Sequence, residues 1–241
     1  MDEQQQKKKL FFIKLNDNAS ERKASARYFL YALALIACVY LTELFHLLDK
    51  PLFSLVYYGY LADVAYNLVS AVFLIGALIG FHRIARKFLG TKLLEKREDD
   101  ETLSLYSRIA LYVMTALPII LTGIFLGFQF KVVYELGEKV NMYTLLNNLS
   151  RYALNGAKLF AFLYFIMLTQ TGAEKLFETS KNLPFGGFLC MITFGLIEVF
   201  VSPSIFAWLY FALCLYYGII YLVSGRRFFV TFTLMMLLYV L

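Results

Sequence analysis

Charged residues are scarce in this chain. They make up 17% of its 241 residues, whereas hydrophobic residues make up 60% and the mean hydropathy is +0.65. An ordinary soluble domain carries about a quarter charged residues, so this balance argues against one and makes lipid the expected solvent. With 24 Phe and 18 Tyr, ring side chains are abundant, which is typical of helices that face lipid and its headgroups.

Metal-binding and catalytic patterns are also missing. Cys38, Cys190 and Cys214 lie in apolar runs without a CxxC spacing, which indicates neither a disulfide framework nor a thiolate metal site. His46 and His82 are the two histidines, and no GxSxG, HExxH or glycine-rich phosphate-binding motif occurs. We therefore expect no cofactor and no catalytic residue, and an enzyme is the less favoured interpretation.

The apolar residues are grouped in segments long enough to cross a bilayer, which takes roughly 20 residues at about 1.5 Å each. We predict an all-α polytopic transmembrane helix bundle. A polar tail at residues 1–27, without a cleavable secretory signal, precedes a single transmembrane domain at 28–241. The sequence leaves open whether the short apolar segment 228–241 crosses the bilayer. The six expected spans lie near residues 28–48, 56–81, 106–130, 152–171, 185–202 and 205–224.

The placement of Lys and Arg predicts the orientation. Eighteen of the 23 lie in segments 1–27, 82–108 and 172–184 or in the pair Arg226-Arg227. By the positive-inside rule these segments face the cytosol, or the matrix in an organelle, and the N-terminus with them. The charge bias does not distinguish a bacterial inner membrane from a eukaryotic organelle membrane. The chain has a net charge of +6, and its basic residues flank the apolar spans. The expected partner is therefore the lipid bilayer and not nucleic acid.

Ionisable and amide side chains inside the spans define the candidate site. An ionisable group within the bilayer costs roughly 2.5 to 3.5 kcal/mol, so each one needs a physical reason. Counting about 1.5 Å per residue places these side chains in the outer third of the bilayer, on four different spans. We expect them to line an outward-facing polar pocket or ion pathway formed by Asp63, Glu198, Lys158, Asn155, Glu43 and His46.

Two other interpretations of these residues remain open. Glu43 and His46 are three residues apart and share a helix face, as in carboxylate-bridged metal sites, so with Asp63 they are candidate metal ligands. Such sites normally need the Glu-x-x-His pair twice, and no metal is assigned. Alternatively, Lys158 neutralises Asp63 or Glu198 in a structural ion pair, while Glu43 and His46 extend to the outer headgroups.

Prolines mark either the ends of spans or a bend within one. Pro51 is expected at a span boundary, where a missing amide donor costs least. Pro118 lies within a span and removes the hydrogen-bond donor of the Met114 carbonyl, which predicts a kink. Thr115 is near enough to compensate for the lost bond.

Two GxxxG motifs allow close approach between helices. They occur at Gly76–Gly80 and at Gly123–Gly127. Because glycine is frequent in membrane helices, we prefer packing within the bundle over a dimer interface.

Three classes of function follow from these residues. The first is a small transporter or an ion- or proton-coupled membrane protein that uses the outer polar pocket. The alternative is a non-catalytic subunit or scaffold of a larger membrane protein complex, which contacts other subunits through residues 82–108 and 228–241. The third is an intramembrane metal-dependent enzyme that uses Glu43 and His46.

Overall fold

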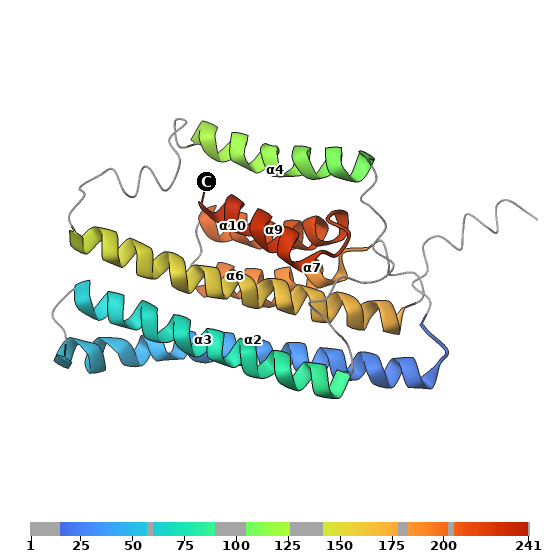
Figure 1. Ribbon diagram of the computed structural model, residues 1–241, viewed down its shortest axis with the longest axis horizontal. Coiled ribbons are helices and arrows are strands. Elements are labelled where there is room, and N and C mark those ends of the chain that lie inside the picture. The colour runs from blue at the N-terminus through green and yellow to red at the C-terminus, as the bar shows by residue number, and fades with distance from the viewer. Residues whose placement is uncertain are drawn as a thin grey trace, which may run out of the picture.

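The computed structural model describes residues 15–56, 60–89, 105–125, 142–177, 183–201 and 205–240. Within these ranges the chain is helical apart from short connections and one isolated antiparallel bridge between Leu15 and Phe177. Most of the long helices run nearly side by side along the long axis of the molecule (Figure 1). The elements are α2 (Ala19–Val56), α3 (Tyr60–Leu89), α4 (Leu105–Phe125), α6 (Met142–Leu176), α7 (Phe185–Cys190), the π-helical segment η2 (Met191–Gly195), α8 (Leu196–Val201), α9 (Ile205–Val223) and α10 (Phe228–Val240).

Three of the described helices are long and apolar enough to cross a membrane. Their apolar stretches are Ala19–Thr42, Leu61–Leu89 and Leu145–Leu176. The all-α fold class is therefore confirmed, whereas the count of about six spans stays a prediction. Shorter apolar helices occupy Ile109–Ile120, Phe185–Phe200, Ala207–Val223 and Phe228–Tyr239.

Helix α2 extends beyond the span predicted at 28–48 in both directions. Asn18 caps its start, because the Asn18 Oδ1 accepts a hydrogen bond from the backbone N–H of Ser20 at 3.0 Å. The helix thus begins inside the segment predicted as a polar tail. It also continues through Pro51, which we expected at a boundary. Helix α2 is therefore longer at both ends than the apolar segment from which its span was predicted.

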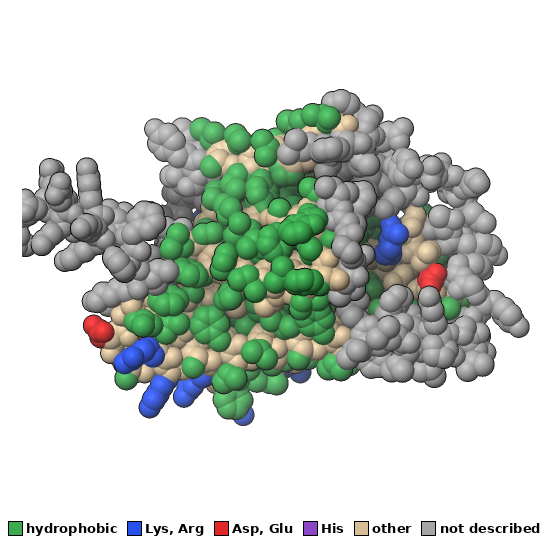
Figure 2. Space-filling model, turned by 180° about the vertical axis from the view of Figure 1, so that it is seen from behind, with side chains coloured by type: hydrophobic (Ala, Val, Ile, Leu, Met, Phe, Trp, Pro, Cys, Tyr) green, Lys and Arg blue, Asp and Glu red, His purple; other side chains and the backbone are tan. Residues whose placement is uncertain are grey.

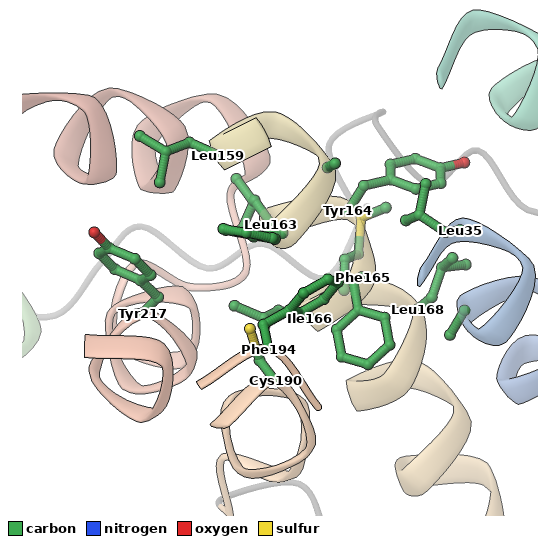
Figure 3. Close-up of a cluster of buried hydrophobic side chains, with 14 of the residues drawn as sticks. Leu35, Leu159, Leu163, Tyr164, Phe165, Ile166, Leu168, Cys190, Phe194 and Tyr217 are labelled. Carbon is green, nitrogen blue, oxygen red and sulfur yellow. The ribbon is translucent and has the colours of Figure 1, made fainter. Parts of the chain in front are cut away.

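Helix α6 is the centre of the bundle. Residues 161–173 are buried all round, which is typical of a helix surrounded by others. Helices α2 and α3 pack against α6 and against each other, and α7 and α10 pack against α6 as well. Figure 1 shows α10 on the side of α6 opposite to α2 and α3. In the core, Phe165 and Ile166 lie beside Phe194 and Cys190 of the neighbouring segment (Figure 3). The centre of the described bundle is therefore filled by large side chains.

Helices α7 and α9 meet through glycine. A Cβ atom added at Gly187 would lie 2.7 Å from the Cα of Gly218, and one added at Gly218 would lie 2.3 Å from the Cα of Gly187. At Gly186 an added Cβ would lie 2.3 Å from the carbonyl oxygen of Ile166. Any side chain at these positions would force the backbones apart, so the glycines set the distances from α7 to α9 and to α6.

The first GxxxG motif does not make such a contact. A Cβ added at Gly76 or Gly80 would meet no atom of the described residues within 4 Å. The preferred prediction of packing within the bundle is therefore wrong for this motif, because these glycines point away from the helices that α3 packs against. The second motif, Gly123–Gly127, extends beyond the described part of α4.

Helix α4 packs against α9 and α10, and one of its contacts arises from Pro118. Thr115 was expected to compensate for the amide lost at Pro118, but the Thr115 Oγ1 instead donates to the carbonyl of Leu111 at 2.7 Å. The hydroxyl of Tyr216 on α9 donates to the freed carbonyl of Met114. Because lipid offers no hydrogen bonds, a proline in a membrane helix needs such a donor from a neighbour.

Candidate functional site

Two of the three predicted carboxylates, Asp63 and Glu198, lie on different parts of the bundle. Asp63 is in the first turn of α3, and Glu198 is in α8. Both side chains are exposed. Helix α3 packs against α2 and α6, whereas α8 packs against η2 and α9. The structure thus places these two acids on the outside of the bundle and on helices with different neighbours.

Asn155 and Lys158 are both half-buried on α6. The Asn155 Nδ2 donates a hydrogen bond to the hydroxyl of Tyr239 on α10, and the Tyr239 ring lies edge-on to that of Tyr152 at 5.9 Å. Asn155 therefore connects the central helix to the C-terminal helix. Its partner is an aromatic hydroxyl and not one of the predicted acids.

Glu43 and His46 lie on α2, but their side chains are outside the described residues, so their role as pocket or metal-binding residues stays a prediction. Among the side chains that are described, no group of three or more His, Cys, Asp or Glu is close enough together to hold a metal ion. Asp63, the third candidate ligand, is described and belongs to no such group.

A polar contact that the sequence analysis missed joins α3 to α6 at the predicted outer end. The Asn67 Nδ2 lies 3.1 Å from the Oγ of Ser150 and 3.4 Å from the Oδ1 of Asn147. Asn67 and Ser150 are both buried, and interhelical bonds of this kind stabilise helix pairs in membranes. The signal that could have identified them is the amide of Asn67, one turn after Asp63 in a predicted span that is mostly apolar.

A second missed network lies at the predicted inner end, around the buried Gln170 of α6. The Gln170 Nε2 donates to the Glu174 Oε1 at 3.0 Å and to the carbonyl of Leu183 at 3.0 Å. The Gln170 Oε1 accepts a bond from the backbone N–H of Gly186 at 3.0 Å. One amide thereby satisfies groups on α6 and on the chain entering α7, which removes the cost of burying them.

The turn between α9 and α10 joins the same network. Arg226 has a left-handed backbone with a φ of 62°, a conformation that costs a non-glycine residue roughly 1 to 2 kcal/mol. Its guanidinium forms an ion pair with Glu174 at 2.7 Å, where the Glu174 side chain is only 10% exposed. The charged hydrogen bond offsets the backbone strain and fixes this turn against the end of α6.

The start of α2 is fastened to the end of α6 as well. The Ser25 Oγ donates to the carbonyl of Gly172 at 2.7 Å, and the Lys175 Nζ lies 2.8 Å from the Glu21 Oε2. The basic segments that were predicted to share one face of the membrane therefore have their described parts at one end of the molecule. Figure 2 shows Lys and Arg side chains gathered at that end, beside a broad hydrophobic surface.

No protein-family model, curated protein or solved structure matches this chain. Its function therefore has to follow from this geometry. The described residues place interhelical polar contacts at both ends of α6, a filled apolar centre between them, and Asp63 and Glu198 on the outer surface. Such an arrangement fixes helices relative to one another and offers its outer faces for contact.

Proposed function

We propose that the chain is a polytopic membrane protein of about six spans with its N-terminus on the cytosolic or matrix side. Three apolar helices of sufficient length support the embedding. The clustering of eighteen of the 23 basic residues in four segments supports the orientation. The meeting of the described parts of these segments at one end of the bundle agrees with it.

Within the membrane we propose a non-catalytic role, as a subunit or scaffold of a larger membrane protein complex. The observation that carries this proposal is the filled centre of the bundle. Leu163, Ile166 and Leu168 of α6 have no exposed surface, and the candidate acids Asp63 and Glu198 face outward. A transport pathway would place its ionisable groups toward an interior cavity, where water lowers the cost of their charge. A scaffold needs only a rigid bundle with contact surfaces.

The outward face of α3 is the contact surface that we favour. Gly76 and Gly80 stand in open space, and Val72 and Ile79 on the same helix are exposed. Glycines four residues apart let the backbone of a second helix approach closely, which strengthens packing in lipid. A helix of another subunit could therefore occupy this face.

Blue native electrophoresis and chemical crosslinking in native membranes test the role. The wild-type chain, 27.8 kDa by sequence, should migrate in a larger complex in mild detergent, and the double variant Gly76→Ile, Gly80→Ile should lose it. Ala116→Ile, which enlarges an exposed residue of α4, is the matched control and should keep the complex. A wild-type chain that migrates as a monomer would contradict the scaffold.

The same preparations separate the scaffold from the transporter. Asp63→Asn and Glu198→Gln should leave the complex intact, because these carboxylates lie away from the filled centre. A proton-dependent flux through reconstituted vesicles that either substitution abolished would favour the transporter instead.

A further inference from the structure

A cavity of about 100 Å³ lies between the start of α2 and the ends of α3 and α6. It shares Lys175 with the ion pair to Glu21 described above, and the scaffold role does not use it. A volume of this size holds several water-sized groups, enough for a phosphate group. The lining residues are Ala24, Arg27, Tyr28, Phe88, Leu89 and Lys175.

The lining combines two cations with apolar surface. Arg27 and Lys175 supply positive charge, and no residue of the lining is acidic. One carboxylate, that of Glu21, contacts the Lys175 Nζ at 2.8 Å, but an ammonium has three donors and a guanidinium five. Hydrogen-bonding capacity therefore remains for an anion at the cavity, and an oxyanion can accept two parallel bonds from the guanidinium.

The position of the cavity along the helices favours a membrane headgroup as the source of that anion. The spans predicted at 28–48, 56–81 and 152–171 each have one limit at this end. Tyr28 lies at the first limit, Lys175 lies four residues beyond 171, and Phe88 lies seven residues beyond 81. Phe88 and Leu89 present apolar surface beside the cations. A charged phosphate with its glycerol and acyl carbons needs this pairing, and basic pockets between helices on the inner side of membranes bind such headgroups.

We propose that this cavity binds a phosphate-bearing anion, namely the headgroup of an acidic phospholipid from the inner leaflet. The phosphate is held by Arg27 and Lys175, and its hydrocarbon portion lies against Phe88. This proposal rests on the membrane embedding proposed above but not on the scaffold role. Retention of the chain in membrane pellets at alkaline pH tests the embedding separately.

Native mass spectrometry of the purified full chain tests the site, with phosphatidylglycerol and phosphatidylcholine of identical acyl chains as probes. We compare Ala24→Glu, which puts a carboxylate in the cavity, with Ala26→Glu, which adds the same charge at an exposed position two residues away. Ala24→Glu should weaken phosphatidylglycerol binding about tenfold, and Ala26→Glu by less than about twofold, because like charges repel strongly only at short range.

A second pair of variants removes charge instead of adding it. Arg27→Gln should also weaken phosphatidylglycerol binding, whereas Lys23→Gln, an exposed cation outside the lining, should not. Equal losses within either matched pair, or equal binding of the two lipids by the wild type, would overturn the site, because the attraction would then be a general surface effect.

Soluble glycerol 3-phosphate distinguishes the two sources of the anion. Phosphatidylglycerol that stays bound at millimolar glycerol 3-phosphate supports the lipid headgroup. Displacement at that concentration would overturn the lipid assignment and point to a free phosphate compound.

Discussion

The hydrogen bond from Tyr216 to the Met114 carbonyl can be tested by a double-mutant cycle. Pro118 has no amide hydrogen, so the carbonyl four residues earlier has no donor within α4. Replacing Tyr216 by Phe removes the hydroxyl that fills this place and leaves the ring. In the Pro118→Ala background the helix supplies its own amide donor to Met114, and the hydroxyl is no longer needed there.

The expected magnitude follows from the surroundings of the carbonyl. A buried polar group left without a partner costs roughly 1 to 3 kcal/mol, whereas hydrogen bonds between membrane helices contribute about 0.6 kcal/mol on average. Tyr216 is half-buried, and lipid offers no replacement donor. We therefore expect Tyr216→Phe to lower the free energy of unfolding by about 1 kcal/mol when Pro118 is present, and by less than about 0.5 kcal/mol when residue 118 is Ala.

Reversible unfolding in mixed micelles, with the fraction of the ionic detergent as the variable, gives these free energies. The coupling between the two sites is the difference between the two costs of Tyr216→Phe. A cost that is the same in both backgrounds would refute the assignment of the hydroxyl to the carbonyl freed by Pro118.

The same unfolding assay tests two further contacts. Gly218→Ala places a methyl group against the backbone of Gly187 and should lower the free energy of unfolding by about 1 to 3 kcal/mol through overpacking. Gly76→Ala meets open space and should cause no measurable loss. Similar losses for both variants would contradict the glycine contact. Glu174→Gln removes the shielded ion pair with Arg226 and should lower the free energy of unfolding by about 1 to 3 kcal/mol. Glu21→Gln breaks an ion pair whose side chains are 31% and 38% exposed and should lower it by less than about 1 kcal/mol. The reverse order would show that burial does not determine the strength of these pairs.

The apolar parts of the helices were predictable because run length and hydrophobicity depend only on local sequence, whereas the extensions of α2 and α6 beyond their apolar parts were not. The apolar spans expected at 185–202 and 205–224 agree closely with the consecutive elements α7, η2 and α8 and with helix α9, respectively. Whether a helix crosses depends on the surrounding lipid as well as on its length. The helical fold is therefore established, and the number of crossings is a prediction.

The contacts between helices were predictable only in part. Counting residues predicts a depth for Asp63 and Glu198 but not the direction in which each helix turns its side chains, and the two acids lie on helices with different neighbours. Gln170 shows the same limit, because its partners at Leu183 and Gly186 lie beyond a break in the helix. Conversely, the sequence shows that Pro118 leaves the Met114 carbonyl without an amide donor, but it does not show that Tyr216 of α9 supplies the replacement.

We propose a membrane-embedded bundle whose helices have their basic ends on one face of the membrane. Side-specific labelling in sealed native vesicles measures this orientation. Lys87→Cys and Arg151→Cys place thiols near opposite ends of the described bundle, both at exposed positions. With a membrane-impermeant maleimide, we expect labelling of residue 87 only from the cytosolic or matrix side and of residue 151 only from the other side. Labelling of both thiols from the same side of intact vesicles would contradict it.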